Sequence, residues 1–309
     1  MGNFIKRHLD NLNTGYPPFA VKIVKYEEHD YQKEKKIPIL NIVLLVLTFI
    51  TTTIAGANAE GAFWNVMISG LPYSIAIIII LLSHEMGHYF AAKRFGVRAT
   101  LPYFIPFPSL FGTMGAVIKT KSPIPDRRAL FYIGTMGPLS GFVVSLIAVI
   151  IGIYLSEIKP VPVPSKEILI PVMGDSLLFK FLVWKIHGTM HPGYDLYLSG
   201  IAWAGWIGFF VTSLNLIPIG QLDGGHILYS LIGRKQVCFG WCALCIIICL
   251  AFVWPGWIVW IVLSLVLFMI AHPAVPDSAP LSTQEKALGW FCMSLLIFTF
   301  IPIPVYFIE

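Results

Sequence analysis

Long apolar runs separated by short polar connections define the pattern of this sequence. Seven runs are long enough, at about 20 residues per crossing, to pass through a bilayer as helices. Trp254, Pro255 and Gly256 form a turn signal between the fifth and sixth runs, which predicts a tight hairpin there. We therefore predict an all-α polytopic membrane protein with about six to seven transmembrane helices, in residues 37–57, 71–95, 129–155, 198–217, 237–253, 257–271 and 288–308.

The composition supports a membrane protein and narrows its partners. Of the 309 residues, 57% are hydrophobic and 12% are charged, with a mean hydropathy of +0.78, which is too apolar for a soluble chain. The net charge of +5 comes from basic residues spread between the apolar runs, as in loops at a membrane surface. We expect contact with the lipid bilayer and none with nucleic acid. Four of the five cysteines have the spacing of one apolar helix face and predict neither a disulfide framework nor a metal site.

The basic residues also predict an orientation. The first 36 residues are polar and lack the apolar core of a secretory signal, so we interpret them as a cytoplasmic tail. With the N-terminus inside, 17 of the 21 Lys and Arg residues fall on the cytoplasmic side, in agreement with the positive-inside rule. This topology places the C-terminus outside and favours the cytoplasmic membrane.

Residues 77–94 carry the clearest chemical signal, because they place His84, Glu85 and His88 inside an apolar run. On a helix the two histidines lie one turn apart on one face. At this spacing two imidazoles can bind Zn²⁺ while the glutamate serves as general base for a metal-bound water. An acid at membrane depth costs about 2.5–3.5 kcal/mol on the insertion scale, so three clustered polar side chains indicate a function. The alternative is a buried polar cluster that holds helices together.

A second polar segment follows the fourth apolar run. Pro218 ends the predicted helix, Gly220 frees the backbone, and Asp223 begins a new helical segment. Glu85 and Asp223 are the only two of the sixteen acids that lie within or against the apolar runs. We therefore expect both to belong to one site, toward the cytoplasmic ends of their helices.

Two connecting segments carry weaker signals. Glycines bracket apolar residues in residues 111–118, which favours a short β-hairpin or edge strand after the His84 helix. A connector lying on the bilayer surface is the alternative. In the connection at residues 156–197, the apolar run 177–186 is too short to cross a bilayer and predicts an interfacial or re-entrant helix.

With both polar segments in view, the chain resembles the site-2 protease family of intramembrane zinc metalloproteases. The resemblance rests on HEMGH in one apolar run and, in the right order, on N-x-x-P-x-x-x-L-D-G, which starts at Asn215. The sequence GTMGP, ending at Pro138, also resembles the helix-packing feature of that family. The implied domains are a cytoplasmic tail (1–36), a first transmembrane helix and loop (37–67), the metalloprotease core (68–235) and C-terminal transmembrane helices (236–309).

The resemblance implies one Zn²⁺ per chain, bound by His84, His88 and Asp223 with water in the fourth position. Glu85 would act as general base and acid, and Asn215 would hold the substrate strand or the developing oxyanion. The implied function is that of an intramembrane zinc endopeptidase, which cuts transmembrane segments of membrane-protein substrates in regulated proteolysis. The expected member is compact, since a 42-residue connection is too short for a PDZ domain and a further span stands in place of C-terminal CBS motifs.

Other functions fit parts of the pattern. The prenyl-protein and stress proteases also carry HExxH in a membrane helix, but they use a later glutamate as third ligand, and no suitable Glu follows His88. His226, one turn beyond Asp223, is interpreted as a supporting or capping residue. The non-enzyme alternative is a membrane transporter or a metal-binding scaffold with a non-catalytic zinc site. Glu85 argues against it, because zinc binding alone requires no base there. The sequence leaves the substrate and the oligomeric state open.

Overall fold

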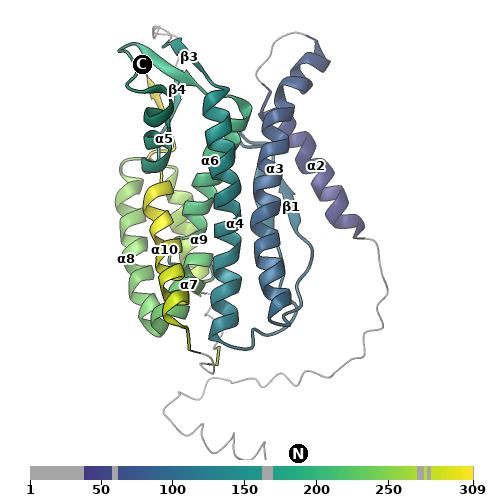
Figure 1. Ribbon diagram of the computed structural model, residues 1–309, viewed down its shortest axis with the longest axis vertical. Coiled ribbons are helices and arrows are strands. Elements are labelled where there is room, and N and C mark those ends of the chain that lie inside the picture. Colours follow the sequence, from purple (N-terminus) through teal and green to yellow (C-terminus); the bar gives the residue numbers. More distant parts are fainter. Residues whose placement is uncertain (1–37, 58–61, 162–169, 270–274, 277–279, 309) are drawn as a thin grey trace, which may run out of the picture. The chain divides into compact units, whose positions relative to one another are not determined.

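The structure is a computed structural model that describes residues 38–57, 62–161, 170–269, 275–276 and 280–308 (Figure 1). The predicted cytoplasmic tail lies outside the described residues. Helices dominate the described part of the chain. They are α2 (Ile39–Ala55), α3 (Phe63–Arg94), α4 (Arg127–Tyr154), α5 (Leu177–His187), α6 (Gly200–Asn215), α7 (Asp223–Ile232), α8 (Gln236–Ala251), α9 (Trp257–Met269) and α10 (Thr283–Thr299), with a 3-10 turn, η2 (Gly233–Lys235), between α7 and α8.

Among the described residues, three helical segments are long and apolar enough to cross a membrane. They are α3, α4 and the segment Asp223–Ala251, which joins α7, the 3-10 turn and α8. Helices α2 and α9 are apolar but shorter. Large apolar side chains such as Ile79, Ile147 and Val262 are exposed on these helices, as expected for surfaces that face lipid. The mostly helical fold is thereby confirmed, with three candidate membrane-spanning segments among the described residues, whereas six to seven crossings stay a prediction.

Local sequence sets several of the helix ends. The side chain of Asp126 accepts a hydrogen bond from the backbone N–H of Ala129 at the start of α4. At the start of α10, Ser282 and Glu285 form a capping box. Helix α6 ends at Asn215 before the predicted break. The turn Trp254-Pro255-Gly256 separates α8 from α9, so the prediction of two helices there is confirmed.

The last predicted span, residues 288–308, is wrong in its bounds. Helix α10 begins earlier, at Thr283, and ends at Thr299. The following residues include strand β6 (Val305–Ile308), which pairs antiparallel with β4 (Ile170–Met173). Apolar content alone cannot distinguish these two states, because the strand is defined by hydrogen bonds to a segment far away in the sequence.

The remaining strands form two further antiparallel pairs. β1 (Tyr103–Pro106) pairs with β2 (Thr113–Val117), and β3 (Glu157–Pro160) pairs with β5 (Tyr194–Tyr197). The hairpin prediction for residues 111–118 is thus confirmed, although its first strand lies upstream of the predicted segment. The short apolar run at residues 177–186 forms the helix α5, as predicted, and its interfacial or re-entrant position stays a prediction.

Helices α3, α4 and α6 pack together around the largest core (Figure 1). Its fully buried side chains include Tyr73 and Ile77 of α3, Phe131 of α4, and Trp206 and Phe209 of α6. The indole N–H of Trp206 donates to the carbonyl of Gly174, which ties α6 to the segment after β4. The three packed helices therefore fix the position of α3, which carries His84, Glu85 and His88.

Candidate active site and metal centre

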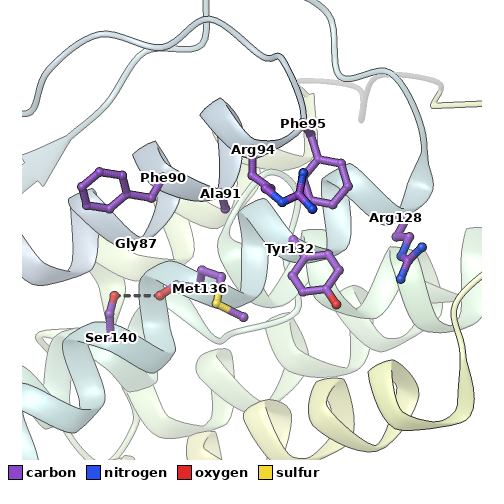
Figure 2. A pocket seen from close by; sticks show the side chains of 9 residues that line it. All are labelled: Gly87, Phe90, Ala91, Arg94, Phe95, Arg128, Tyr132, Met136 and Ser140. Atoms are coloured by element: carbon purple, nitrogen blue, oxygen red, sulfur yellow. Dashed lines mark hydrogen bonds between the residues drawn. The ribbon is translucent and has the colours of Figure 1, made fainter.

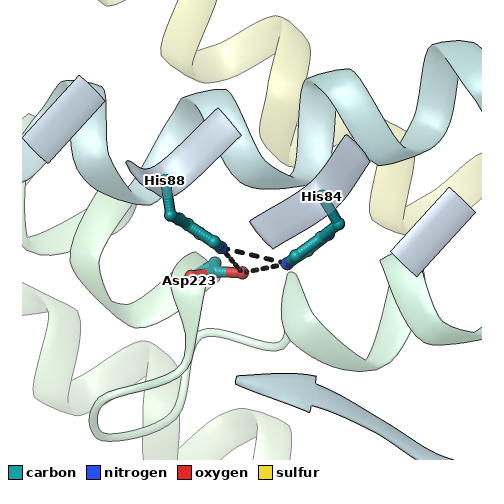
Figure 3. A group of neighbouring side chains, drawn as sticks. All are labelled: His84, His88 and Asp223. Atoms are coloured by element: carbon teal, nitrogen blue, oxygen red, sulfur yellow. Dashed lines mark hydrogen bonds and ion pairs between the residues drawn. The ribbon is translucent and has the colours of Figure 1, made fainter. Parts of the chain in front are cut away.

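The histidines of HEMGH project from one face of α3 and meet the first residue of α7 (Figure 3). His84, Glu85 and His88 are only 5%, 6% and 7% exposed. The carboxylate of Asp223 points between the two imidazoles (Figure 3). Helix geometry aligns the histidines because residues i and i+4 share a face. The structure thus brings His84 and His88 together with Asp223, which lies 135 residues beyond His88 in the sequence, as the family resemblance implied.

The three ligand atoms form a small triangle. His84 Nε2 and His88 Nε2 are 3.0 Å apart, and Asp223 Oδ2 lies 3.3 Å from the first and 3.4 Å from the second. A tetrahedral zinc ion with bonds of about 2.0–2.2 Å holds its ligands about 3.4 Å apart. Within the described ranges, this is the one group of three or more His, Cys, Asp or Glu side chains that could hold a metal ion. Its donor types and separations fit Zn²⁺.

A backbone carbonyl fixes the tautomer of His88. His88 Nδ1 lies 2.6 Å from the carbonyl oxygen of Ile133 on α4. Because a carbonyl only accepts, Nδ1 carries the hydrogen, and Nε2 presents its lone pair to the ligand triangle. His84 Nε2 faces it from 3.0 Å. A cation held by both nitrogens would be stabilised by this close approach.

Glycines on α4 make room for the imidazole rings. A Cβ added at Gly137 would lie 2.1 Å from His88 Nε2, and one added at Gly141 would lie 3.0 Å from His84 Nδ1. Any side chain at Gly137 would therefore displace His88 or push α3 and α4 apart. This contact explains the physical need for glycine in the GTMGP sequence.

Asn215 and Asp223 reach the site from the two ends of one turn. Asn215 is the last residue of α6, and its amide Nδ2 lies 3.3 Å from His84 Nε2. The chain then turns at Gly220, whose φ of +52° is a left-handed conformation that favours glycine. Asp223 follows as the first residue of α7, where the helix dipole favours a carboxylate. The sequence signals at Pro218 and Gly220 thus mark the turn that delivers Asp223.

Glu85 lies beside the ligand triangle and contacts the β-hairpin. Its carboxylate accepts a hydrogen bond from the backbone N–H of Ile118, the residue after β2. The Glu85 carboxylate also interacts electrostatically with His88 and Asp223. The end of β2 is therefore held directly against the carboxylate that the sequence marks as a base.

His226 and the cysteines of α8 do not belong to the metal-binding group. His226 is outside the metal-binding group, and its Cβ packs 2.9 Å from the position of a Cβ built on Gly134. The four cysteines of α8 are exposed on the helix surface and belong to no metal-binding group in the described part of the chain.

The backbone groups that contact the site were not identified from the sequence. The carbonyl of Ile133 and the N–H of Ile118 are not visible as side-chain types, so no residue pattern identifies them. Gly141 also escaped notice, whereas Gly137 was part of a recognised pattern. The metal-binding and catalytic roles of His84, Glu85, His88, Asn215 and Asp223 stay predictions that the geometry supports.

Comparison with known proteins adds a family to this geometry. The sequence model described as Peptidase family M50 matches residues 72–253 of the chain, which is more than half of it. A rice protein (Oryza sativa subsp. japonica), "Probable zinc metalloprotease EGY1, chloroplastic", is 35% identical over 179 residues, or 56% of this chain and 30% of that protein. Its namesake in Arabidopsis thaliana is 29% identical over 247 residues, or 76% of this chain and 43% of that protein. The chain thus spans less than half the length of these relatives.

Proposed function

Because the chain belongs to peptidase family M50, we propose that it is a zinc metalloendopeptidase that hydrolyses peptide bonds in or near transmembrane segments of other membrane proteins. One observation carries this proposal, namely the buried triangle of His84, His88 and Asp223 at the separations of zinc ligands. Relatives named as zinc metalloproteases support both the metal and the reaction. The position of the triangle on long apolar helices supports a substrate within the membrane.

The residues of the site divide the work of hydrolysis. His84, His88 and Asp223 would hold Zn²⁺, which lowers the pKa of water and polarises a carbonyl when it is bound. Glu85 removes one proton from the attacking water while the water oxygen bonds to the carbonyl carbon. It then donates that proton to the amide nitrogen as the C–N bond breaks. The amide of Asn215, beside His84, is suited to donate to the oxyanion that develops on the carbonyl.

The substrate needs an extended backbone near Glu85, because a helical carbonyl is already hydrogen-bonded and shielded. Strand β2 has a partner on one side, β1, among the described residues. Its other edge is available for an added strand, which would be held by main-chain hydrogen bonds. The contact between Ile118 and Glu85 supports a scissile bond positioned at the end of that edge.

The wider setting is part of the same proposal. The basic residues favour a topology with the N-terminus and the site toward the cytoplasmic side. The apolar runs favour six to seven crossings. A role in regulated intramembrane proteolysis completes the proposal. A transmembrane protein as substrate is the corresponding partner.

The proposal is tested with the purified full chain, by measuring zinc per chain and cleavage of a test transmembrane substrate. Glu85→Gln preserves all three ligands, so it should keep about one zinc per chain and lose cleavage. Asp223→Asn should lose zinc itself, because an amide is a poorer ligand than a carboxylate. Glu157→Gln makes the same change as Glu85→Gln on the exposed strand β3 and should leave both properties unchanged.

Each function class gives a different result in this assay. A wild-type chain that binds zinc but never cleaves would indicate a metal-binding scaffold. Full activity in Glu85→Gln would refute the assigned base.

A further inference from the structure

A groove separate from the metal site is lined by residues of α3 and α4 (Figure 2). Its volume is about 570 Å³, within the range of about 300–1,000 Å³ that is usual for sites of small ligands. Its lining comes from one stripe of each helix, at three- and four-residue spacing. None of the residues of the candidate active site lines it. The groove therefore requires its own explanation.

The groove changes in polarity along its length. Phe90 and Ala91 line it about one turn before the end of α3, and Met136 lines it about two and a half turns after the start of α4. Phe90 is 60% exposed. Arg94 is the last residue of α3, and Arg128 is the second residue of α4, so both cations stand where the two helices end. Figure 2 shows both arginines and Tyr132 toward one end of the groove and Phe90 toward the other. A ligand that fills it must be apolar at one end and anionic at the other.

At the charged end, the guanidinium groups of Arg94 and Arg128 have N–H donors that can bind an anion. Arg94 is exposed, and its side chain has no hydrogen bond or ion pair with any of the described residues. Arg128 donates its Nε–H to Glu285 Oε1 at 2.6 Å, but a guanidinium carries five N–H donors. The connection between α3 and α4 adds further Lys and Arg residues and contains a single acid, Asp126. This end therefore attracts anions from the membrane surface.

We propose that the groove binds one anionic phospholipid, with its phosphate at Arg94 and Arg128 and an acyl chain along Phe90, Ala91 and Met136. Basic pockets between transmembrane helices are suited to anionic headgroups, and an acyl chain covers the apolar stripe that a free phosphate would leave bare. Tyr132 lies between the two parts, where an aromatic ring with a polar tip fits the membrane interface.

The test measures lipid binding to the purified full chain in detergent by native mass spectrometry. Phosphatidylglycerol is compared with phosphatidylcholine of the same acyl chains, and inorganic phosphate is added as a competitor. We expect one retained phosphatidylglycerol per chain, little retained phosphatidylcholine and no displacement by phosphate. The readout is bound lipid, so it does not depend on the proposed protease activity.

Matched variants locate the binding site. Arg94→Gln should weaken phosphatidylglycerol binding about fivefold, the worth of one basic residue near a membrane surface. Lys93→Gln removes the same charge from the adjacent residue, which does not line the groove, and should change binding less than twofold. Phe90→Ala should weaken binding, whereas Leu82→Ala, at an exposed position of α3 outside the groove, should not.

Three results would overturn the lipid site. Equal retention of both lipids would remove the anionic headgroup from the proposal. Equal losses of phosphatidylglycerol binding in Arg94→Gln and Lys93→Gln would indicate that the lipid is attracted by the general positive charge of the surface and not by the groove. Displacement by inorganic phosphate would indicate a phosphate site without an acyl chain.

Discussion

The backbone N–H of Ile118 donates a hydrogen bond to the carboxylate of Glu85, which joins the end of strand β2 to the proposed base. Along a strand, successive N–H groups point to opposite edges. The N–H groups of Lys119 and Lys121 bond to Thr100 and Arg98 on the β1 side. The N–H of Ile118 therefore marks the other edge, and that of Ala116 is expected to share it.

Proline at Ala116 tests whether this edge holds substrate. Ala116→Pro removes one N–H from the edge, and the loss of one backbone hydrogen bond should slow cleavage about tenfold while zinc content persists. Ala116→Ser keeps the N–H and should be mild. Cleavage rates of the two variants, compared at equal zinc occupancy, decide the question. Indistinguishable rates would remove β2 from substrate binding.

Alanine at Gly137 tests the packing of α4 against His88. The added Cβ would lie 2.1 Å from His88 Nε2, so the ring must move away from the ligand triangle. We expect zinc affinity to fall by about 10–100-fold, as when a group that orients a ligand is disturbed. Gly141→Ala makes a looser contact, 3.0 Å from His84 Nδ1, and should cost less. Metal titration measures the zinc affinity, and thermal melting of the zinc-free protein shows whether the variant is still folded. A Gly137→Ala protein with the zinc affinity of the wild type would contradict the prediction.

The pair of Arg128 and Glu285 predicts a stability change at low pH. Burial raises the pKa of Glu285, but hydrogen bonds from Ser282 and Arg128 outweigh it and lower the pKa from 4.5 to about 2. A carboxyl whose pKa is lower in the folded state stabilises the fold above its unfolded pKa. That contribution is lost as the pH falls from about 4.5 to about 2. Glu285→Gln should therefore lower the melting temperature at neutral pH and flatten its decline over that window. A wild-type slope in the variant would show that other groups cause the decline.

Reporter fusions test the topology. Arg127 Nε donates to the carbonyl of Ser230, and Arg128 pairs with Glu285, so the basic segments around α4, η2 and α10 meet at one end. Strand β6, near the C-terminus, pairs with β4 beyond the opposite end of α4 (Figure 1). A reporter inserted near Ser122 should be active only inside, and one fused after Glu309 only outside. Activity of both reporters on one side would contradict this topology.

The sequence by itself determined those features that depend on local geometry. An apolar run predicts a helix from its own residues, and the i, i+4 spacing places His84 and His88 on one face of any helix that contains them. Pro218 and Gly220 likewise mark the break before α7, because proline and glycine restrict or free their own backbone. Because acids are rare within apolar runs, the sequence also predicted that Glu85 and Asp223 belong to one site.

Only the tertiary structure decided what depends on contacts between distant segments. The carbonyl of Ile133 sets the tautomer of His88, and the N–H of Ile118 holds Glu85; every residue has such backbone groups, so only the fold selects the ones that act. The end of α10 at Thr299 follows from β6 pairing with β4, which apolar content does not encode. The groove that joins Arg94 to Arg128 exists because α3 and α4 pack side by side, with both cations at the same end.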